Sequence, residues 1–174
     1  MLQSPRVILR EIQLTDAEDL FEMDSDADVH RFIENKPVTK IEEIHQVVEI
    51  LHKQYKENGI ARWAVEDKIS GECLGWCGLK FFREPLNGHV NFYELGYRFK
   101  QKHWGKGYAT ESARAVLDYV FKNLPIDTIY AITHPENVNS KNVLFKLGFR
   151  YVETFNYDGD ATDWFEVKRM NLEL

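Results

Sequence analysis

Apolar residues recur every three or four positions along two long stretches of the chain, a spacing that is typical of helices burying one face. The first stretch runs from Thr39 to about Glu57, and Asn58-Gly59 follows it as a signal for the end of a helix. The second begins after Gly107 and stops before Pro125, because proline cannot continue a helix. We therefore predict two long amphipathic helices.

Two shorter helices are predicted from their boundaries. Thr15 with Glu18 three residues later forms the pattern of a capping box, so a helix should begin there and run to about Met23. The other covers Asn139 to Leu147 and is closed by Gly148.

Elsewhere the apolar period shortens, and β-branched and aromatic residues indicate strands. Asn87-Gly88 is the strongest hairpin signal in the chain and makes the strands on either side antiparallel neighbours. A strand–helix–strand unit follows, and such a unit adds a parallel pair to a sheet. The expected strands are Val7–Ile12, Ala61–Glu66, Cys73–Phe82, Val90–Phe99 and Thr128–Thr133, followed by two that flank a turn at Asp158-Gly159. The pattern predicts a single mixed α/β domain over residues 1–174, antiparallel in its first half.

The composition is that of an ordinary globular protein, and it mainly serves to exclude certain classes of binding partner. Of the 174 residues, 44% are hydrophobic and 29% charged, the net charge is −6 and the isoelectric point is about 5.5. Nucleic acid as the main partner is disfavoured, because phosphate binding needs a concentrated basic face. No apolar run approaches the length of a membrane span, and the N-terminus lacks the apolar core of a signal peptide. We therefore expect no membrane partner and a cytoplasmic location.

The two cysteines, Cys73 and Cys77, lie four residues apart in a predicted strand, which separates them by about 13 Å. A disulfide requires Cα atoms within about 7 Å. The pair is therefore predicted to be reduced, which agrees with a cytoplasmic setting. No second cysteine or histidine cluster completes a ligand set, so no metal site is expected.

The stretch QKHWGKGYAT, Gln101 to Thr110, stands where a predicted strand gives way to a helix. The first amides of a helix lack intrahelical partners and carry partial positive charge, and glycine lets a ligand approach them. Gly105 and Gly107, with Lys106 between them, therefore indicate a site for an anion, most naturally a pyrophosphate. The loop matches neither the P-loop pattern nor the dinucleotide fingerprint, whose third glycine is Thr110 here. On these residues alone, a plain connecting turn is the alternative.

A second stretch, NVNSKNVLFKLGF from Asn137 to Phe149, favours the cofactor interpretation. Together with RVILREIQLTDAEDL, FYELGYRF and WGKGYATES, it resembles the GNAT superfamily of N-acetyltransferases over most of the chain. The resemblance is greatest to the branch that acetylates ribosomal-protein N-termini (RimJ/RimL-like). It implies a mostly antiparallel sheet flanked by helices, with a central parallel pair of strands that splay apart. It also implies acetyl-CoA as cosubstrate, bound between Val90–Phe99 and Thr128–Thr133.

The resemblance assigns the cosubstrate contacts to one strand and to the glycine loop. Backbone groups near Leu95, Tyr97 and Phe99 would pair with the pantetheine arm, and the amides of residues 104–109 would hold the pyrophosphate. The family has Arg or Gln where this chain has Lys102, a mild departure because the contact is mostly through backbone. The full set is Leu95, Tyr97, Phe99, Lys102, His103, Trp104, Gly105, Lys106, Gly107, Tyr108, Ala109 and Asn137.

Acetyl transfer from a thioester to an amine requires a neutral amine, a donor to the developing oxyanion and a donor to the leaving thiolate. The position at which the family often carries a carboxylate base corresponds to Glu94, with a salt bridge or a solvated strand residue as the alternative. Asp163 and Glu166 are further acids, for which a solvated role is favoured. The tyrosine that much of the superfamily places four residues after Ser140 is Leu144 here. Ser140 is therefore the candidate thiolate donor, with a helix cap as its alternative.

These observations predict an acetyl-CoA-dependent N-acetyltransferase that acts on a primary amine by direct attack in a ternary complex. The acceptor is a protein N-terminal amine or a small-molecule amine, and the sequence decides neither this nor the oligomeric state. Acceptor specificity is expected in Asp24–Pro37 and the last hairpin. A non-catalytic acyl-CoA-binding module is the alternative function, and a nucleotide-binding protein has only the glycine loop in its favour. Five aromatic residues are candidates for the lining of an acceptor pocket, with packing in the core as the alternative: Phe32, Trp63, Trp76, Tyr157 and Trp164.

Overall fold

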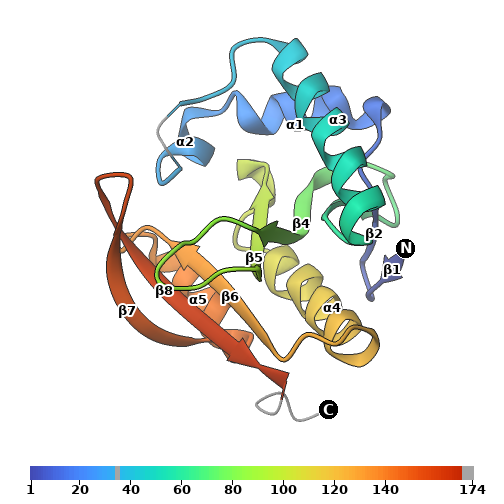
Figure 1. Ribbon diagram of the computed structural model, residues 1–174. Coiled ribbons are helices and arrows are strands. Elements are labelled where there is room, and N and C mark those ends of the chain that lie inside the picture. The colour runs from blue at the N-terminus through green and yellow to red at the C-terminus, as the bar shows by residue number, and fades with distance from the viewer. Residues whose placement is uncertain (34–35, 170–174) are drawn as a thin grey trace.

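The computed structural model describes residues 1–33 and 36–169, and its centre is an eight-stranded sheet (Figure 1). The strand order is β1-β2-β3-β4-β5-β6-β8-β7, and all neighbours are antiparallel except β5 and β6. The predicted mixed sheet with one parallel pair is thus confirmed within the described ranges. The strands are β1 (Leu2–Gln3), β2 (Val7–Glu11), β3 (Arg62–Asp67), β4 (Cys73–Phe82), β5 (Phe92–Phe99), β6 (Thr128–Thr133), β7 (Arg150–Tyr157) and β8 (Asp160–Lys168).

Helices cover both faces of this sheet. One face carries α1 (Ala17–Asp24) and α3 (Ile41–Asn58), and the other carries α4 (Tyr108–Asn123) and α5 (Val138–Lys146). The short helix α2 (Ala27–His30) lies within the segment that was predicted to be irregular, and this prediction is corrected. The Asp26 side chain begins α2 by accepting a hydrogen bond from Asp28 N at 2.9 Å, a cap that stabilises even one turn.

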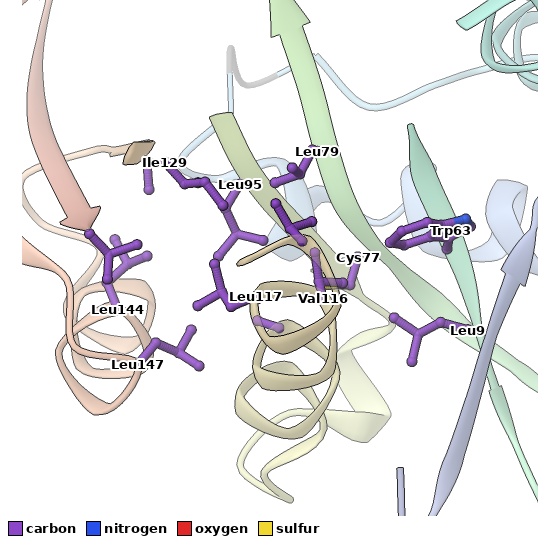
Figure 2. Packing of buried hydrophobic residues seen from close by; sticks show 14 of the residues in the cluster. Leu9, Trp63, Cys77, Leu79, Leu95, Val116, Leu117, Ile129, Leu144 and Leu147 are labelled. Carbon is purple, nitrogen blue, oxygen red and sulfur yellow. The ribbon is translucent and has the colours of Figure 1, made fainter. Parts of the chain in front are cut away.

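The larger part of the core lies between α4 and the sheet, as Figure 2 shows. Val116 and Leu117 of α4 are fully buried and belong to one cluster with Leu95 of β5. Leu144 of α5 and Ile129 of β6 extend the cluster under the second half of the sheet. Each such side chain contributes about 1.5–3 kcal/mol through burial. This packing fixes α4, and therefore its N-terminus, against β4 and β5.

The long helix α3 begins two residues later than predicted and ends at Asn58, and Gly59 adopts the left-handed conformation (φ 69°) expected at its end. The capping box predicted at Thr15 is wrong. A 3-10 helix spans Leu14–Asp16, and Asp16 Oδ2 accepts a hydrogen bond from Gln13 N at 2.8 Å. Arg10 explains the change, because its two terminal nitrogens each donate to the Asp16 carboxylate at 2.8 Å and hold it in place.

Both predicted hairpin turns are present. Asn87-Gly88 has positive φ at both positions (47° and 75°), and Leu86 and His89 exchange backbone hydrogen bonds of 2.9 Å. Asp158-Gly159 also has positive φ at both positions (52° and 101°). Such values are typical of tight hairpin turns. Strand β5 begins two residues later than predicted, because Asn91 is left-handed (φ 52°) and interrupts the extended chain.

The parallel strands β5 and β6 are paired at a single point, with Glu94 opposite Tyr130, and they part beyond it. The splayed pair that the family resemblance implies is therefore confirmed. Aromatic rings gather around the pairing point: Tyr130 lies 4.7 Å from His89, 5.4 Å from Phe92 and 5.0 Å from Trp164, measured between ring centres. Ring packing thus supports a junction that has few backbone contacts.

The open edge of β5 exposes backbone groups beyond the pairing point. On its other edge β5 pairs with β4 throughout, and the series continues where Lys100 N donates to Leu74 O at 3.0 Å. Successive residues of a strand direct their N–H and C=O groups to opposite edges. The backbone groups of Leu95, Tyr97 and Phe99 consequently face the open side.

Two expectations from composition can be examined in the structure. Cys73 and Cys77 are free, as predicted, and both are buried. Among the helices of residues 1–33 and 36–169, none combines the length and the apolar character needed to cross a membrane.

Candidate functional site

A cleft of about 600 Å³ lies beside the open edge of β5. One wall is formed by α2 and the residues that follow it, up to Ile33. The end of β5, from Tyr97 to Phe99, lines its middle. The remaining wall comprises the 3-10 turn Gln101–His103, the glycine loop and the first turns of α4 and α5. A cleft of this size between several elements suits a small-molecule ligand.

The glycine loop places the N-terminus of α4 at this cleft. Gly105 and Gly107 are both left-handed (φ 72° and 83°), and a Cβ on Gly105 would meet nothing within 4 Å. Gly107 is the N-cap of α4, and the next three residues line the cleft. The Trp104 indole N–H donates to Phe99 O at 2.8 Å and so ties the loop to the end of β5. The amides and the helix dipole together form the geometry of an anion site.

Most residues predicted to contact a cosubstrate line this cleft, and three do not. Leu95 is a core residue with 2% exposure. The Lys102 ammonium turns to Glu22 and Glu72, at 3.0 and 2.8 Å. Lys106 contributes its carbonyl to a contact outside the cleft. The residues that do line the cleft are Tyr97, Phe99, His103, Trp104, Gly105, Gly107, Tyr108, Ala109 and Asn137.

Ser140 lies in the first turn of α5, but it is not the cap. Asn137 is the N-cap, because its Oδ1 accepts a hydrogen bond from Ser140 N at 3.1 Å. The alternative role of Ser140 as a helix cap is therefore wrong. Its hydroxyl lies 3.0 Å from the Tyr97 hydroxyl, and both residues line the cleft. Burial raises the pKa of Tyr97, and the hydrogen bond with Ser140 offsets only part of this effect.

Glu94 lies at the pairing point of β5 and β6, outside the lining of the cleft. Alternation along the strand places it on the opposite face from Leu95, which packs under α4, and on the same face as Arg98. Burial raises the pKa of the Glu94 carboxyl, although the charges of Arg62 and Lys80 act in the opposite direction. A carboxyl group with a raised pKa next to a cleft is suited to proton transfer.

A sequence profile of the GNAT acetyltransferase domain matches residues 6–150. The chain belongs to the GNAT acetyltransferase family. The uncharacterized N-acetyltransferase p20 of Bacillus licheniformis is 30% identical over 149 residues, which are 86% of this chain and 82% of p20. The crystal structure of a GNAT-family acetyltransferase from Bacillus anthracis has a TM-score of 0.80 at 26% identity, covering 97% of this chain and 98% of that one. The predicted fold and acetyl-CoA-dependent N-acetyltransferase activity are confirmed.

The finer assignment to the RimJ/RimL-like branch stays a prediction. The RimL ribosomal-protein α-N-acetyltransferase in complex with coenzyme A has a TM-score of 0.80 and covers 95% of each chain, but the identity is 17%. A likeness at that identity shows the shared fold alone. The branch, and with it the acceptor of this acetyltransferase, needs other observations.

Arg6 supports the glycine loop of the acetyltransferase from outside the cleft. Its Nη1 donates to Lys106 O at 2.9 Å, and its Nε donates to Glu111 Oε2 of α4 at 2.7 Å. Its guanidinium carbon lies 4.4 Å from the centre of the Tyr108 ring. One side chain next to β2 therefore holds both the loop and the first turn of α4.

Replacing Arg6 with methionine should weaken acetyl-CoA binding about fivefold and leave kcat at saturating acetyl-CoA nearly unchanged. The reason is the loss of about 1 kcal/mol of hydrogen bonding that keeps the empty loop in its binding conformation. Calorimetric titration with CoA and steady-state kinetics measure the two quantities. Arg83→Met is the matched control, since Arg83 pairs with Glu57 at 3.3 Å on an exposed surface. Equal weakening in both variants would contradict the role of Arg6.

A buried lysine at the foot of the loop was missed by sequence reasoning. Lys100 is 3% exposed, and its Nζ lies 2.6, 2.7 and 3.0 Å from carboxylate oxygens of Asp19, Glu22 and Glu72. The hydrogen bond from Lys102 and then that from Lys100 lower the pKa of Glu72 to about 2. The cluster fixes the point where β5 passes into the glycine loop. Its members are far apart in the chain, so no local pattern announces it.

Of the five aromatic candidates for an acceptor pocket, Phe32 lines the cleft. Trp63, Trp76 and Trp164 are 7%, 8% and 1% exposed and belong to the interior. Tyr157 lies at the end of β7 and is not one of the lining residues. The aromatic signal was therefore informative at one position, the one in the segment before α3.

The two further acids have structural partners. Asp163 was expected to be solvated, but it is buried (3% exposed) and accepts hydrogen bonds from Lys141 at 2.7 Å and Thr154 at 2.6 Å. Burial acts to raise its pKa, but these hydrogen bonds outweigh burial and lower the pKa. Glu166 pairs with Arg150 at 3.0 Å. Neither acid lines the cleft.

Proposed function

We propose that the acetyltransferase transfers the acetyl group directly from acetyl-CoA to a primary amine while both are bound. In this proposal Glu94 is the base and Ser140 donates a hydrogen bond to the departing thiolate. The supporting observation is one continuous cleft of about 600 Å³, from the glycine loop along the open edge of β5 to Ser140. The N-terminus of α4 suits a pyrophosphate, and the open edge of β5 suits the amide groups of a pantetheine arm.

The amine acceptor is proposed to approach from the face of the sheet on which Glu94 and Arg98 lie. Arg98 lines the cleft together with Phe32 and Ile33, and its Nη1 donates to Asp24 Oδ1 at 2.6 Å. This part of the wall is partly apolar and belongs to the segment in which acceptor specificity was expected. It suits the amine of a protein N-terminus or of a small molecule.

The proposed chemistry needs no covalent enzyme intermediate. The amine nitrogen bonds to the carbonyl carbon, the C–S bond breaks, and the proton lost by nitrogen passes to the Glu94 carboxylate. The sulfur leaves with the electron pair, is stabilised by the Ser140 hydroxyl and takes a proton from solvent. Neither cysteine suits a nucleophilic role, since burial raises the pKa of Cys73 to about 12 and raises that of Cys77 as well.

The alternative of a non-catalytic acyl-CoA-binding module is not favoured. The family to which the chain belongs consists of acetyltransferases. A carboxyl group with a raised pKa and a hydroxyl group at the two sides of one strand also offer the donors and acceptors that acetyl transfer requires. A pure binder has no need of either.

A thermal-shift titration with acetyl-CoA, CoA, ATP and NAD tests the proposal first. A ligand at 100 times its dissociation constant should add about 2.7 kcal/mol, which raises the melting temperature of a domain of this size by several degrees. We expect a rise with the two CoA compounds only, and thiol release from acetyl-CoA when a panel of amines is added. Binding without thiol release for any amine would favour the non-catalytic module instead.

A further inference from the structure

Two hydroxyl groups from different elements meet across the open edge of β5. The Tyr97 side chain leaves the strand and reaches the first turn of α5, where its hydroxyl lies 3.0 Å from Ser140 Oγ and 3.1 Å from Ser140 O. The other hydroxyl-bearing residues that line the cleft, Tyr108 and Thr110, belong to α4 beside the glycine loop. Among the described lining residues, Tyr97 and Ser140 are thus the hydroxyl-bearing pair that does not belong to α4.

The Tyr97 hydroxyl has one proton and two acceptors at nearly equal distance. When it donates to Ser140 O, the Ser140 hydroxyl can direct its own proton to the phenol oxygen. When it donates to Ser140 Oγ, the lone pair on that side is occupied and the Ser140 proton must point elsewhere, into the cleft that Ser140 lines. The choice of acceptor therefore decides whether Ser140 presents a donor or an acceptor to the ligand.

We propose that Tyr97 is a positioning residue for acetyl transfer: by donating to Ser140 Oγ, it turns the Ser140 proton toward the sulfur of the departing thiolate. This inference rests on the proposed function. It assigns no proton transfer to Tyr97, which keeps its proton throughout the reaction. The C–S electron pair goes to sulfur, Ser140 stabilises the thiolate by a hydrogen bond, and solvent supplies the proton.

The environment of Tyr97 agrees with a permanent donor. Its ring packs against the core beneath α4, while its hydroxyl reaches the cleft. Burial raises its pKa, so the phenol stays protonated across the working range of an enzyme. The hydrogen bond that Ser140 N donates to Asn137 Oδ1 fixes the backbone of the same serine. Ser140 is therefore held at two points, and its hydroxyl rotation is the freedom that remains for Tyr97 to set.

A double-mutant cycle tests this role. Tyr97→Phe keeps the ring and should lower kcat roughly tenfold with little change in KM for acetyl-CoA. The reason is that Tyr97 orients the hydrogen bond from Ser140 to the thiolate, and this bond to a charged group forms only as the C–S bond breaks. In a Ser140→Ala background the same change should lower kcat less than about twofold, because the hydroxyl that it orients is gone. Tyr119→Phe is the matched control: its ring packs edge-on against Trp63, away from the cleft.

A readout without turnover accompanies the kinetics. The ultraviolet absorbance of the thiolate reports the pKa of the thiol of bound CoA. The wild type should lower this pKa below that of free CoA, and in Tyr97→Phe it should return toward the value of free CoA. Equal losses of kcat in both backgrounds, an effect on KM alone, or an unchanged thiol pKa would overturn the positioning role. Absence of thiol release by the wild type with every amine would instead overturn the proposed function.

Discussion

Glu94→Gln should lower kcat about 10²–10⁴-fold and leave the affinity for acetyl-CoA nearly intact. Glutamine has the size of the glutamate but cannot accept a proton from the attacking amine. Cosubstrate affinity should persist, because Glu94 lies at the β5–β6 pairing point and outside the lining of the cleft. Thiol release at saturating amine and calorimetric titration with CoA measure the two quantities separately.

The pH dependence supplies a second sign of the same role. Burial raises the pKa of Glu94, so kcat/KM of the wild type should rise as pH passes that raised value, and Glu94→Gln should lack this limb. Stability should change in the opposite sense. Folded Glu94 holds its proton to higher pH than the usual value of 4.5, so the wild type loses stability as pH rises from 4.5 through the folded value. Glu94→Gln should not show this loss.

A surface glutamate provides the control for this substitution. Glu153 on β7 accepts a hydrogen bond from Asn87 at 3.1 Å, and Glu153→Gln should leave kcat within about twofold. If Glu94→Gln keeps its kcat, or loses acetyl-CoA affinity and kcat together, another group is the base. Abstraction of the amine proton by a solvent water molecule would then be the simplest alternative to a carboxylate base.

Lys100→Met should lower the free energy of unfolding by about 3 kcal/mol at neutral pH. The substitution keeps an apolar stem in a site that is 3% exposed, but it removes the cation around which Asp19, Glu22 and Glu72 converge. Their carboxylate oxygens lie within 4.8 Å of one another, so mutual repulsion replaces attraction. Urea denaturation followed by circular dichroism gives the difference.

Lowering the pH should narrow the difference between wild type and Lys100→Met. The hydrogen bonds from Lys102 and then from Lys100 lower the pKa of Glu72 from 4.5 to about 2, so the stability that these two pairs contribute is present above about pH 4.5 and lost as pH falls toward 2. Lys102→Met is a close control, because Lys102 contacts Glu22 and Glu72 but is 52% exposed. It should lower stability by less than about 1 kcal/mol. Equal losses in the two variants would show that burial of Lys100 has no special effect.

Elements whose signals are local were predicted with nearly correct bounds. Strands β4 and β6 have the predicted ends, and Asn87-Gly88 closes its hairpin, because period-two patterns and turn residues act over a few neighbouring positions. The glycine loop was located for the same reason, since it stands between one strand and one helix. Family resemblance then supplied the link between this loop and Asn137.

Contacts between distant segments were not predictable from the residues alone. The hydroxyls of Tyr97 and Ser140 are 43 positions apart, and Lys100 meets Asp19 over 81 positions. Neither pair has a periodic or turn signature. A contact over six positions can also lack a recognisable pattern: Thr15 had the better capping pattern, but Arg10 of β2 selects Asp16 instead. Side-chain networks of this kind appear only once the sheet order is known.

The single pairing point between β5 and β6 also bears on how the molecule folds and opens. The strands from β1 to β5 are joined by successive antiparallel ladders, and β6, β8 and β7 form a second such group (Figure 1). Between the two groups of strands, backbone pairing contributes one register pair. The other contacts that join the groups come from α4, α5 and the rings around Tyr130. The junction is therefore the natural boundary between two cooperative units, along which amide protons should exchange by partial opening before global unfolding. A ligand that contacts both units would oppose that opening, so the two units would then unfold together.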